Sequence, residues 1–115
     1  MANTFLLKTA TNLTTGLVTK YTADTSSLDA AVIIGMTFCN KHTSSVNVYC
    51  KLVTDSSSGE NADDIMLLND VAVPAGSTLE FCSGNKLVLQ ADDIIQVKAS
   101  VADKIDWSMS IMEIT

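Results

Sequence analysis

Residues 31–53, AVIIGMTFCNKHTSSVNVYCKLV, carry the pattern that decides the fold of this chain. Apolar side chains recur at every second position in residues 31–39, and the same alternation returns in residues 46–53. A period of two with one polar face is typical of half-buried antiparallel β-strands. The faces expected to be buried are Val32, Ile34, Met36 and Phe38 in the first strand, and Val46, Val48, Cys50 and Leu52 in the second.

The short polar link at residues 41–44 has the length of a hairpin connection between these two strands. In that hairpin Cys39 would lie opposite Val46, and Cys50 would lie opposite Gly35. The two cysteine side chains would also fall on opposite faces, so we expect no disulfide between them.

The C-terminal part of the chain repeats the pattern in residues 95–101 and 105–111, which are joined by the three residues 102–104. The expected buried faces are Ile95, Val97, Ala99 and Val101, then Ile105, Trp107, Met109 and Ile111. Between the two halves lies the only proline, Pro74, followed closely by Gly76. Proline fixes φ and glycine tolerates a positive φ, so residues 74–76 are predicted to form a corner that returns Leu79 and Phe81 to the core.

Together these segments predict eight or nine short strands with turns every eight to twelve residues. The expected fold class is all-β, an antiparallel β-sandwich of Greek-key or jelly-roll-like type. A rival prediction places one short helix over residues 62–70, because two aspartates there suit a helix N-terminus. We expect a single domain over residues 1–115, with residues 1–12 as a candidate N-terminal arm.

Composition excludes several classes of function. The chain has 115 residues, a net charge of −6, and no arginine among its seven basic residues. Such an acidic surface repels a nucleic-acid backbone, so we predict no nucleic-acid binding. No basic amphipathic segment or membrane-spanning stretch occurs, and the apolar run at residues 5–7 is too short for a signal peptide, so we predict no membrane partner and synthesis in a cytoplasm.

Charged residues make up only 17% of the chain, below the roughly 25% usual in soluble domains. Such a deficit favours a protein that covers part of its surface with neighbours. The three cysteines, an odd number without C-x-x-C spacing, are expected to be reduced and packed.

No residue pattern here predicts catalysis. His42, the only histidine, lies in the expected hairpin loop without a nucleophile motif, and we interpret it as an exposed turn residue. The acidic residues of loop 54–64 lack the spacing of a calcium loop, although the loop could bind a cation or a receptor. Aromatic residues, which sugar-binding sites need, are only 5% of the chain. We therefore predict no enzyme activity, no cofactor and no metal site.

Several apolar residues do not fit the predicted buried faces. A bulge or a wide core would absorb them, or they would form an interface with another protein. The residues that we predict for such an interface are Phe5, Leu6, Leu7, Tyr49, Met112 and Ile114.

The order of motifs resembles that of small β-sandwich virion proteins of tailed bacteriophages, especially those of marine and cyanobacterial hosts. The resemblance covers nearly the whole chain. It rests on LVTKYTA (17–23), FCN (38–40), SSVNVYCKLV (44–53), LLNDVAVPAGSTLEF (67–81), KLVLQADDIIQVKAS (86–100) and IDWSMSIMEIT (105–115). One departure is Ala91-Asp92-Asp93, where the similar proteins have Gly-Asp before the next strand.

The resemblance implies a structural protein of the virion, present in many copies. The leading hypothesis is a capsid decoration or cement protein that binds the major capsid protein or other virion proteins. A tail, neck or fibre-associated adaptor or receptor-binding module is the alternative, since one fold serves both roles. A cellular carbohydrate- or ligand-binding sandwich is the second alternative, and it would need a concave site with aromatic side chains.

Overall fold

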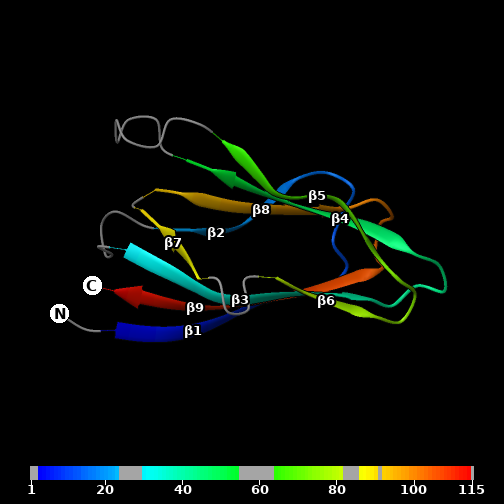
Figure 1. Cartoon of the computed structure of the whole chain (residues 1–115), viewed down its shortest axis with the longest axis horizontal. Coiled ribbons are helices and arrows are strands. Elements are labelled where there is room, and N and C mark those ends of the chain that lie inside the picture. The colour runs from blue at the N-terminus through cyan, green and yellow to red at the C-terminus, as the bar shows by residue number, and fades with distance from the viewer. Residues whose placement is uncertain (1–2, 24–29, 55–63, 82–85, 91, 115) are drawn as a thin grey trace.

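The described part of the chain is all-β, with nine strands in two antiparallel sheets (Figure 1). The computed structural model describes residues 3–23, 30–54, 64–81, 86–90 and 92–114. The strands are β1 (Asn3–Ala10), β2 (Val18–Thr22), β3 (Ala30–Asn40), β4 (Val46–Val53), β5 (Ile65–Val73), β6 (Thr78–Phe81), β7 (Leu87–Leu89), β8 (Ile94–Ala99) and β9 (Ile105–Ile114). The predicted fold class is confirmed. The rival helix over 62–70 is wrong for residues 65–70, which belong to β5.

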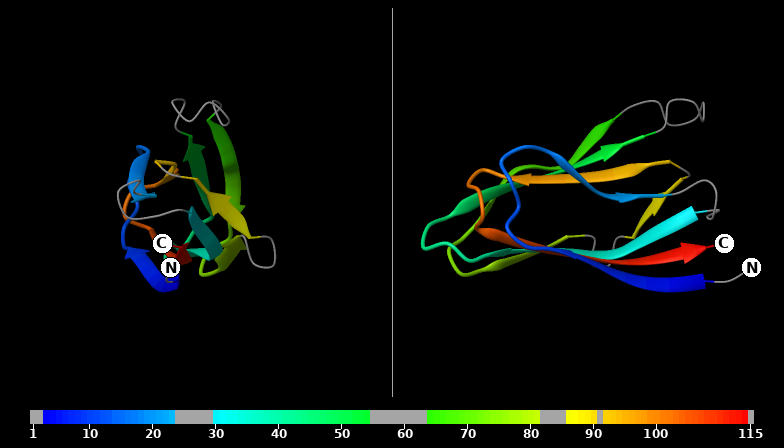
Figure 2. Two further views of the ribbon diagram at one scale, coloured as in Figure 1. Left: turned by 90° about the vertical axis from the view of Figure 1, so that its left-hand side faces the viewer. Right: turned by 180° about the vertical axis from the view of Figure 1, so that it is seen from behind.

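The two sheets pack face to face and enclose one core (Figure 2). The five-stranded sheet has the order β1-β9-β3-β6, and β7 pairs with β3 beside β6. The four-stranded sheet has the order β2-β8-β4-β5. Residues 3–10, which fall in the candidate N-terminal arm, form β1 and pair with β9 along their whole length.

The short links expected to be hairpins instead join strands of different sheets. Residues 41–45 lead from β3 to β4, and residues 100–104 lead from β8 to β9. Cys39 accordingly pairs with Thr78 and Asp106, not with Val46. A link of four or five residues can turn within one sheet or cross the roughly 10 Å to the facing sheet, and the alternation of the flanking strands is the same in both cases.

A bulge in β3 changes which of its side chains are buried. Ile33 pairs with Ile111 while Gly35 pairs with Ser110, so Ile34 is an extra residue without a partner in register. The extra residue reverses the alternation before it. Ala31 and Ile33 are buried instead of Val32 and Ile34, whereas Met36 and Phe38 are buried as predicted.

The remaining alternating faces match their predictions with one exception. The predicted core residues of β4, β8 and β9 are buried, but Val101 lies beyond the end of β8 and is exposed. The corner at 74–76 is confirmed: Gly76 has a φ of 69°, the Ser77 N–H donates to the Pro74 carbonyl at 3.0 Å, and Leu79 and Phe81 pack against the core.

Cys39 and Cys50 belong to different sheets and form no disulfide with each other, as predicted. Cys50 is buried in the core with its Sγ atom 3.8 Å from the Met36 Sδ atom, and Cys39 is half-buried on the opposite face of its own sheet. Cys82 lies outside the described residues.

A buried hydroxyl joins the two sheets near the chain termini. The Tyr21 hydroxyl, on β2, donates to Glu113 Oε2, on β9, at 2.6 Å. Burial, and then the hydrogen bond to the nearby carboxylate, raises the pKa of Tyr21 well above its ordinary value, so the phenol stays protonated. This contact ties β2 of one sheet to β9 of the other.

Candidate functional site

A row of apolar side chains crosses the outer face of the five-stranded sheet. Phe5 pairs with Met112, Met112 pairs with Val32, and Val32 pairs with Val88. Residues directly opposite one another in antiparallel strands point to the same face. These four side chains, from β1, β9, β3 and β7, therefore form one line, which we call the apolar row.

The ends of the apolar row are open to solvent. Phe5 is 70% exposed and Val88 is 53% exposed, while Met112 and Val32 between them are half-buried. Leu7, two residues along β1 from Phe5, is 66% exposed on the same face. Both chain termini lie at this end of the molecule (Figure 1). An apolar surface of this kind on a soluble domain is typical of a contact site for another protein.

The six residues predicted to form an interface are not all brought together. Phe5, Leu7 and Met112 lie on this face, and so does Ile114, which is two residues along β9 from Met112 and pairs with Asn3 at the end of the strand. Leu6 points the other way and packs against the core. The core thus accounts for Leu6, and the outer face of the five-stranded sheet accounts for the other predicted residues of β1 and β9.

Tyr49 belongs to the other sheet. Its hydroxyl donates to Asp70 Oδ1 at 2.8 Å, and the Lys98 Nζ atom lies 4.4 Å from the centre of its ring. Asp70 also accepts a hydrogen bond of 2.6 Å from Asn47 Nδ2, and the two hydrogen bonds lower its pKa. These contacts explain Tyr49 as part of a polar cluster on the outer face of β4.

Two residues of the apolar row, Val32 and Val88, are absent from the predicted set. Val32 was not predicted for this face because a strict alternation through β3, without the bulge at Ile34, assigns it to the core. Val88 lies on the outer face because side chains alternate along β7, where Leu89 is buried and Leu87 packs against the core. In so short a strand, the sequence alone does not show which face is buried.

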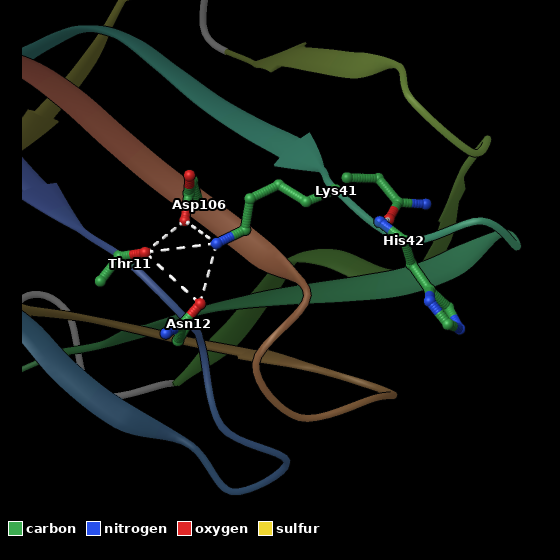
Figure 3. A network of polar contacts seen from close by, with 6 residues as sticks. Thr11, Asn12, Lys41, His42 and Asp106 are labelled. Atoms are coloured by element: carbon green, nitrogen blue, oxygen red, sulfur yellow. Dashed lines mark hydrogen bonds and ion pairs between the residues drawn. The ribbon is translucent and has the colours of Figure 1, made fainter.

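The opposite end of the five-stranded sheet carries a polar network (Figure 3). The Lys41 Nζ atom lies 2.9 Å from Asp106 Oδ1 and donates to Asn12 Oδ1 at 2.8 Å. The Thr11 hydroxyl donates to the same Asp106 oxygen at 2.6 Å. These contacts tie the β1–β2 connection to the link between the sheets and to the start of β9.

His42, beside this network, is half-buried, not exposed as predicted, and its backbone N–H donates to Asn40 Oδ1 at 2.7 Å. Asp92, in the turn that departs from the phage pattern, has a φ of 68°. Glycine adopts that left-handed conformation easily, so the aspartate keeps the backbone shape of a glycine turn.

The polar network predicts a low pKa for Asp106. The Thr11 hydroxyl, then Lys41, stabilise its charged form, so its pKa lies below the ordinary value of about 3.9. Because the pKa of Asp106 is lower in the folded state, the charged carboxylate stabilises the fold at pH values above the ordinary pKa. This contribution is lost as the pH falls through the lowered pKa of the folded state. Because both ends of the ion pair are exposed, we expect less than about 1 kcal/mol.

Nuclear magnetic resonance titration of the Asp106 carboxyl carbon tests this prediction. Thr11→Ala should move the Asp106 pKa upward, towards the ordinary value, and the Asp70 titration should stay unchanged as an internal control. An Asp106 pKa that does not respond to Thr11→Ala would contradict the assigned cause.

The described residues contain no group of three or more His, Cys, Asp or Glu side chains placed to hold a metal ion. The same part of the chain has no helix long and apolar enough to cross a membrane. The acidic residues of loop 54–64 that were weighed as calcium ligands lie outside the described residues, apart from Asp64, whose Oδ1 atom accepts the Thr54 N–H at 3.0 Å.

No protein-family model matches this sequence. No curated protein sequence matches it either. Solved structures do share its fold. One is a protein of Bacillus endospore appendages, described as disulfide-linked pili, with a TM-score of 0.52 and 16% identity over 98% of this chain and 87% of that chain.

Two further similar structures come from infectious bursal disease virus. The T13 viral particle gives a TM-score of 0.57 with 10% identity over 97% of this chain and 31% of that chain. The VP2 subviral particle gives 0.54 with 11% identity over 97% of this chain and 33% of that chain. This chain thus spans about a third of the length of the viral chains. At these identities the likeness shows the β-sandwich fold, in proteins that build assembled particles or appendages.

Proposed function

We propose that this protein is a non-enzymatic structural subunit of a multi-copy particle, a capsid decoration protein of a tailed bacteriophage. The apolar row, with Leu7 beside it, is the observation that carries this proposal. Exposed Phe, Leu and Val side chains aligned across a sheet offer a contact area without catalytic groups. The order of sequence motifs supports the tailed-phage assignment, and the pilus and capsid folds support a role in assembly.

In this function the outer face of the five-stranded sheet binds the shell of major capsid protein. Each copy contributes a small contact, and many identical copies on one particle add these contacts together. The polar network at the far end of the sheet would then remain outside the contact and keep the particle soluble.

Purified virions test the location. Quantitative mass spectrometry and cryo-electron microscopy should find copies in a fixed ratio to the major capsid protein, arranged with capsid symmetry. A few copies at one vertex would indicate a tail or neck component instead. Absence from virions would contradict the proposed function.

The contact surface is tested by removing the two most exposed apolar side chains of β1. The double variant Phe5→Ser/Leu7→Ser should fold, because neither side chain contributes to the core, and should lose its place on the particle. Leu6 is left intact because it packs against the core. Thr9→Ala, on the same face of the same strand, is the matched control and should keep wild-type occupancy. Equal occupancy of all three proteins would show that the shell binds another surface.

A further inference from the structure

The outer edge of β1 differs from the other sheet edges. β1 is eight residues long, pairs with β9 without a register shift, and has no described strand on its other side. β2 and β5, the edges of the facing sheet, both contain register shifts against their partners. β6 and β7 have only four and three residues. Bulges, short length and charged side chains, lysine above all, protect edge strands against pairing. β1 has no bulge and is not short, and its one charge is Lys8, which lies on the inner face with its Nζ atom 6.0 Å from the centre of the Tyr21 ring.

The side chains of β1 complement a second copy of the same strand. When two copies pair antiparallel with Leu6 opposite Leu6, Phe5 of each copy lies opposite Leu7 of the other. The two-fold axis makes this apolar pair twice on the outer face. Residues opposite one another in antiparallel strands point to the same side, so each Leu7 extends the apolar row of the other copy.

This register also suits the one charge in the strand. Lys8 of the second copy lies opposite Thr4, and Thr4 pairs with Glu113 on β9. The long lysine side chain therefore passes over a small residue towards a carboxylate about two strand spacings away, roughly 10 Å, which also accepts the Tyr21 hydroxyl of its own chain. Moving the register by four residues would instead place the two Lys8 side chains opposite each other, which is unfavourable. Moving the register by two residues in one direction would place Leu7 opposite Asn3. Moving it by two residues in the other direction would place Phe5 opposite Thr9.

From this complementarity we infer that two copies of the chain join through β1 to form one continuous sheet of ten strands. The second copy of the chain is then the first protein that contacts the apolar row. The joined face, with Phe5 and Leu7 of both copies at its centre, is the surface that a dimer presents to a larger particle. The inference deepens the proposed function but is tested on the purified chain alone.

The oligomeric state tests the pairing. Sedimentation velocity of the full chain over a range of concentrations should show a dimer with twice the mass of the chain. Leu7→Lys should weaken the dimer by about ten-fold or more, because the two-fold axis repeats the change at two cross-strand pairs. Thr9→Lys adds the same charge to the same face, two residues from Leu7, and should change the dissociation constant much less. A wild-type monomer at all concentrations, or a Leu7→Lys dimer of wild-type affinity, would overturn the inference.

Disulfide trapping tests the register. Opposite residues of antiparallel strands have Cα atoms about 4.5–5.5 Å apart, within disulfide reach. In a background with Cys39→Ser and Cys82→Ser, a mixture of Phe5→Cys and Leu7→Cys chains should form a covalent dimer. The mixture of Phe5→Cys and Thr9→Cys chains is the control and should not. Efficient trapping of Phe5→Cys with itself would overturn the proposed register.

The two proposals fail separately. A chain that dimerises through β1 but is absent from virions would contradict the phage function alone. A virion component that is monomeric in solution and resists trapping would contradict the dimer alone.

Discussion

Phe38→Ala is expected to lower the free energy of unfolding by about 3–5 kcal/mol. Phe38 is fully buried near the C-terminal end of β3, between Leu79 on β6 and Trp107 on β9 in the pairing register. Removing the ring deletes apolar contacts with both neighbours and leaves a cavity that strands paired on both sides cannot close. Small domains have a free energy of unfolding of only about 5–15 kcal/mol, so this single change would remove much of the stability of the fold.

Urea denaturation monitored by circular dichroism measures this loss. Phe38→Leu, which keeps most of the volume, should cost less than half as much and gives a readout if Phe38→Ala does not fold. Cys39→Ala, the next residue, is the matched control on the half-buried outer face and should cost less than about 1 kcal/mol. A loss below 1 kcal/mol for Phe38→Ala would mean that the ring does not lie in the core.

Asn40→Leu is expected to cost about 3 kcal/mol, although leucine is more apolar and similar in size. Asn40 is 1% exposed at the end of β3. Its Nδ2 atom donates to the Val73 carbonyl at 2.8 Å and to the Ser44 carbonyl at 2.9 Å, while Oδ1 accepts the His42 N–H. Leucine would leave these backbone groups without the partner that now satisfies them, and each such loss costs about 1–3 kcal/mol where water cannot replace it.

Urea denaturation again provides the measurement, with Asn47→Leu as the matched control. Asn47 is half-buried and its side chain bonds the exposed Asp70 carboxylate, so its replacement should cost less than about 1 kcal/mol. If the two variants lost equal stability, the Asn40 amide would not be the group that secures the link between the sheets. Its contacts reach the end of β5 as well as residues 41–45, so we expect the loss to affect both sheets together.

The outcome at Asn40 illustrates what sequence reasoning missed. Asn40 was quoted only as part of the motif FCN, and it lies after the bulge on the same inner face as Met36 and Phe38, so the alternation alone places it there. Asparagine in a buried position needs partners for both its donor and its acceptor. Those partners come from residues 4 and 33 positions away in the chain, so no local pattern could have revealed them.

The candidate site was predictable in part. Phe5, Leu7 and Met112 were identified because they did not fit a buried face, which is a local observation. Leu6 and Tyr49 satisfied the same criterion for other reasons, namely contact with the core and a polar cluster with Asp70 and Lys98. Leu6 differs from Phe5 and Leu7 by the face of β1 on which it lies, and Tyr49 differs from them by its sheet. Which face of β1 meets the core depends on packing against distant segments.

The sequence by itself determined that the chain is all-β, where its strongly alternating strands lie, and where Pro74 and Gly76 turn it. These properties depend on the alternation of side chains and on the dihedral limits of single residues, and both can be recognised within short segments of the sequence. Only the tertiary structure decided which strands share a sheet, where the bulge reverses β3, and that Phe5, Met112, Val32 and Val88 form one row. Strand pairing is set by the joint burial of many distant apolar faces, and short links of the same length can serve either a hairpin or a crossing between sheets.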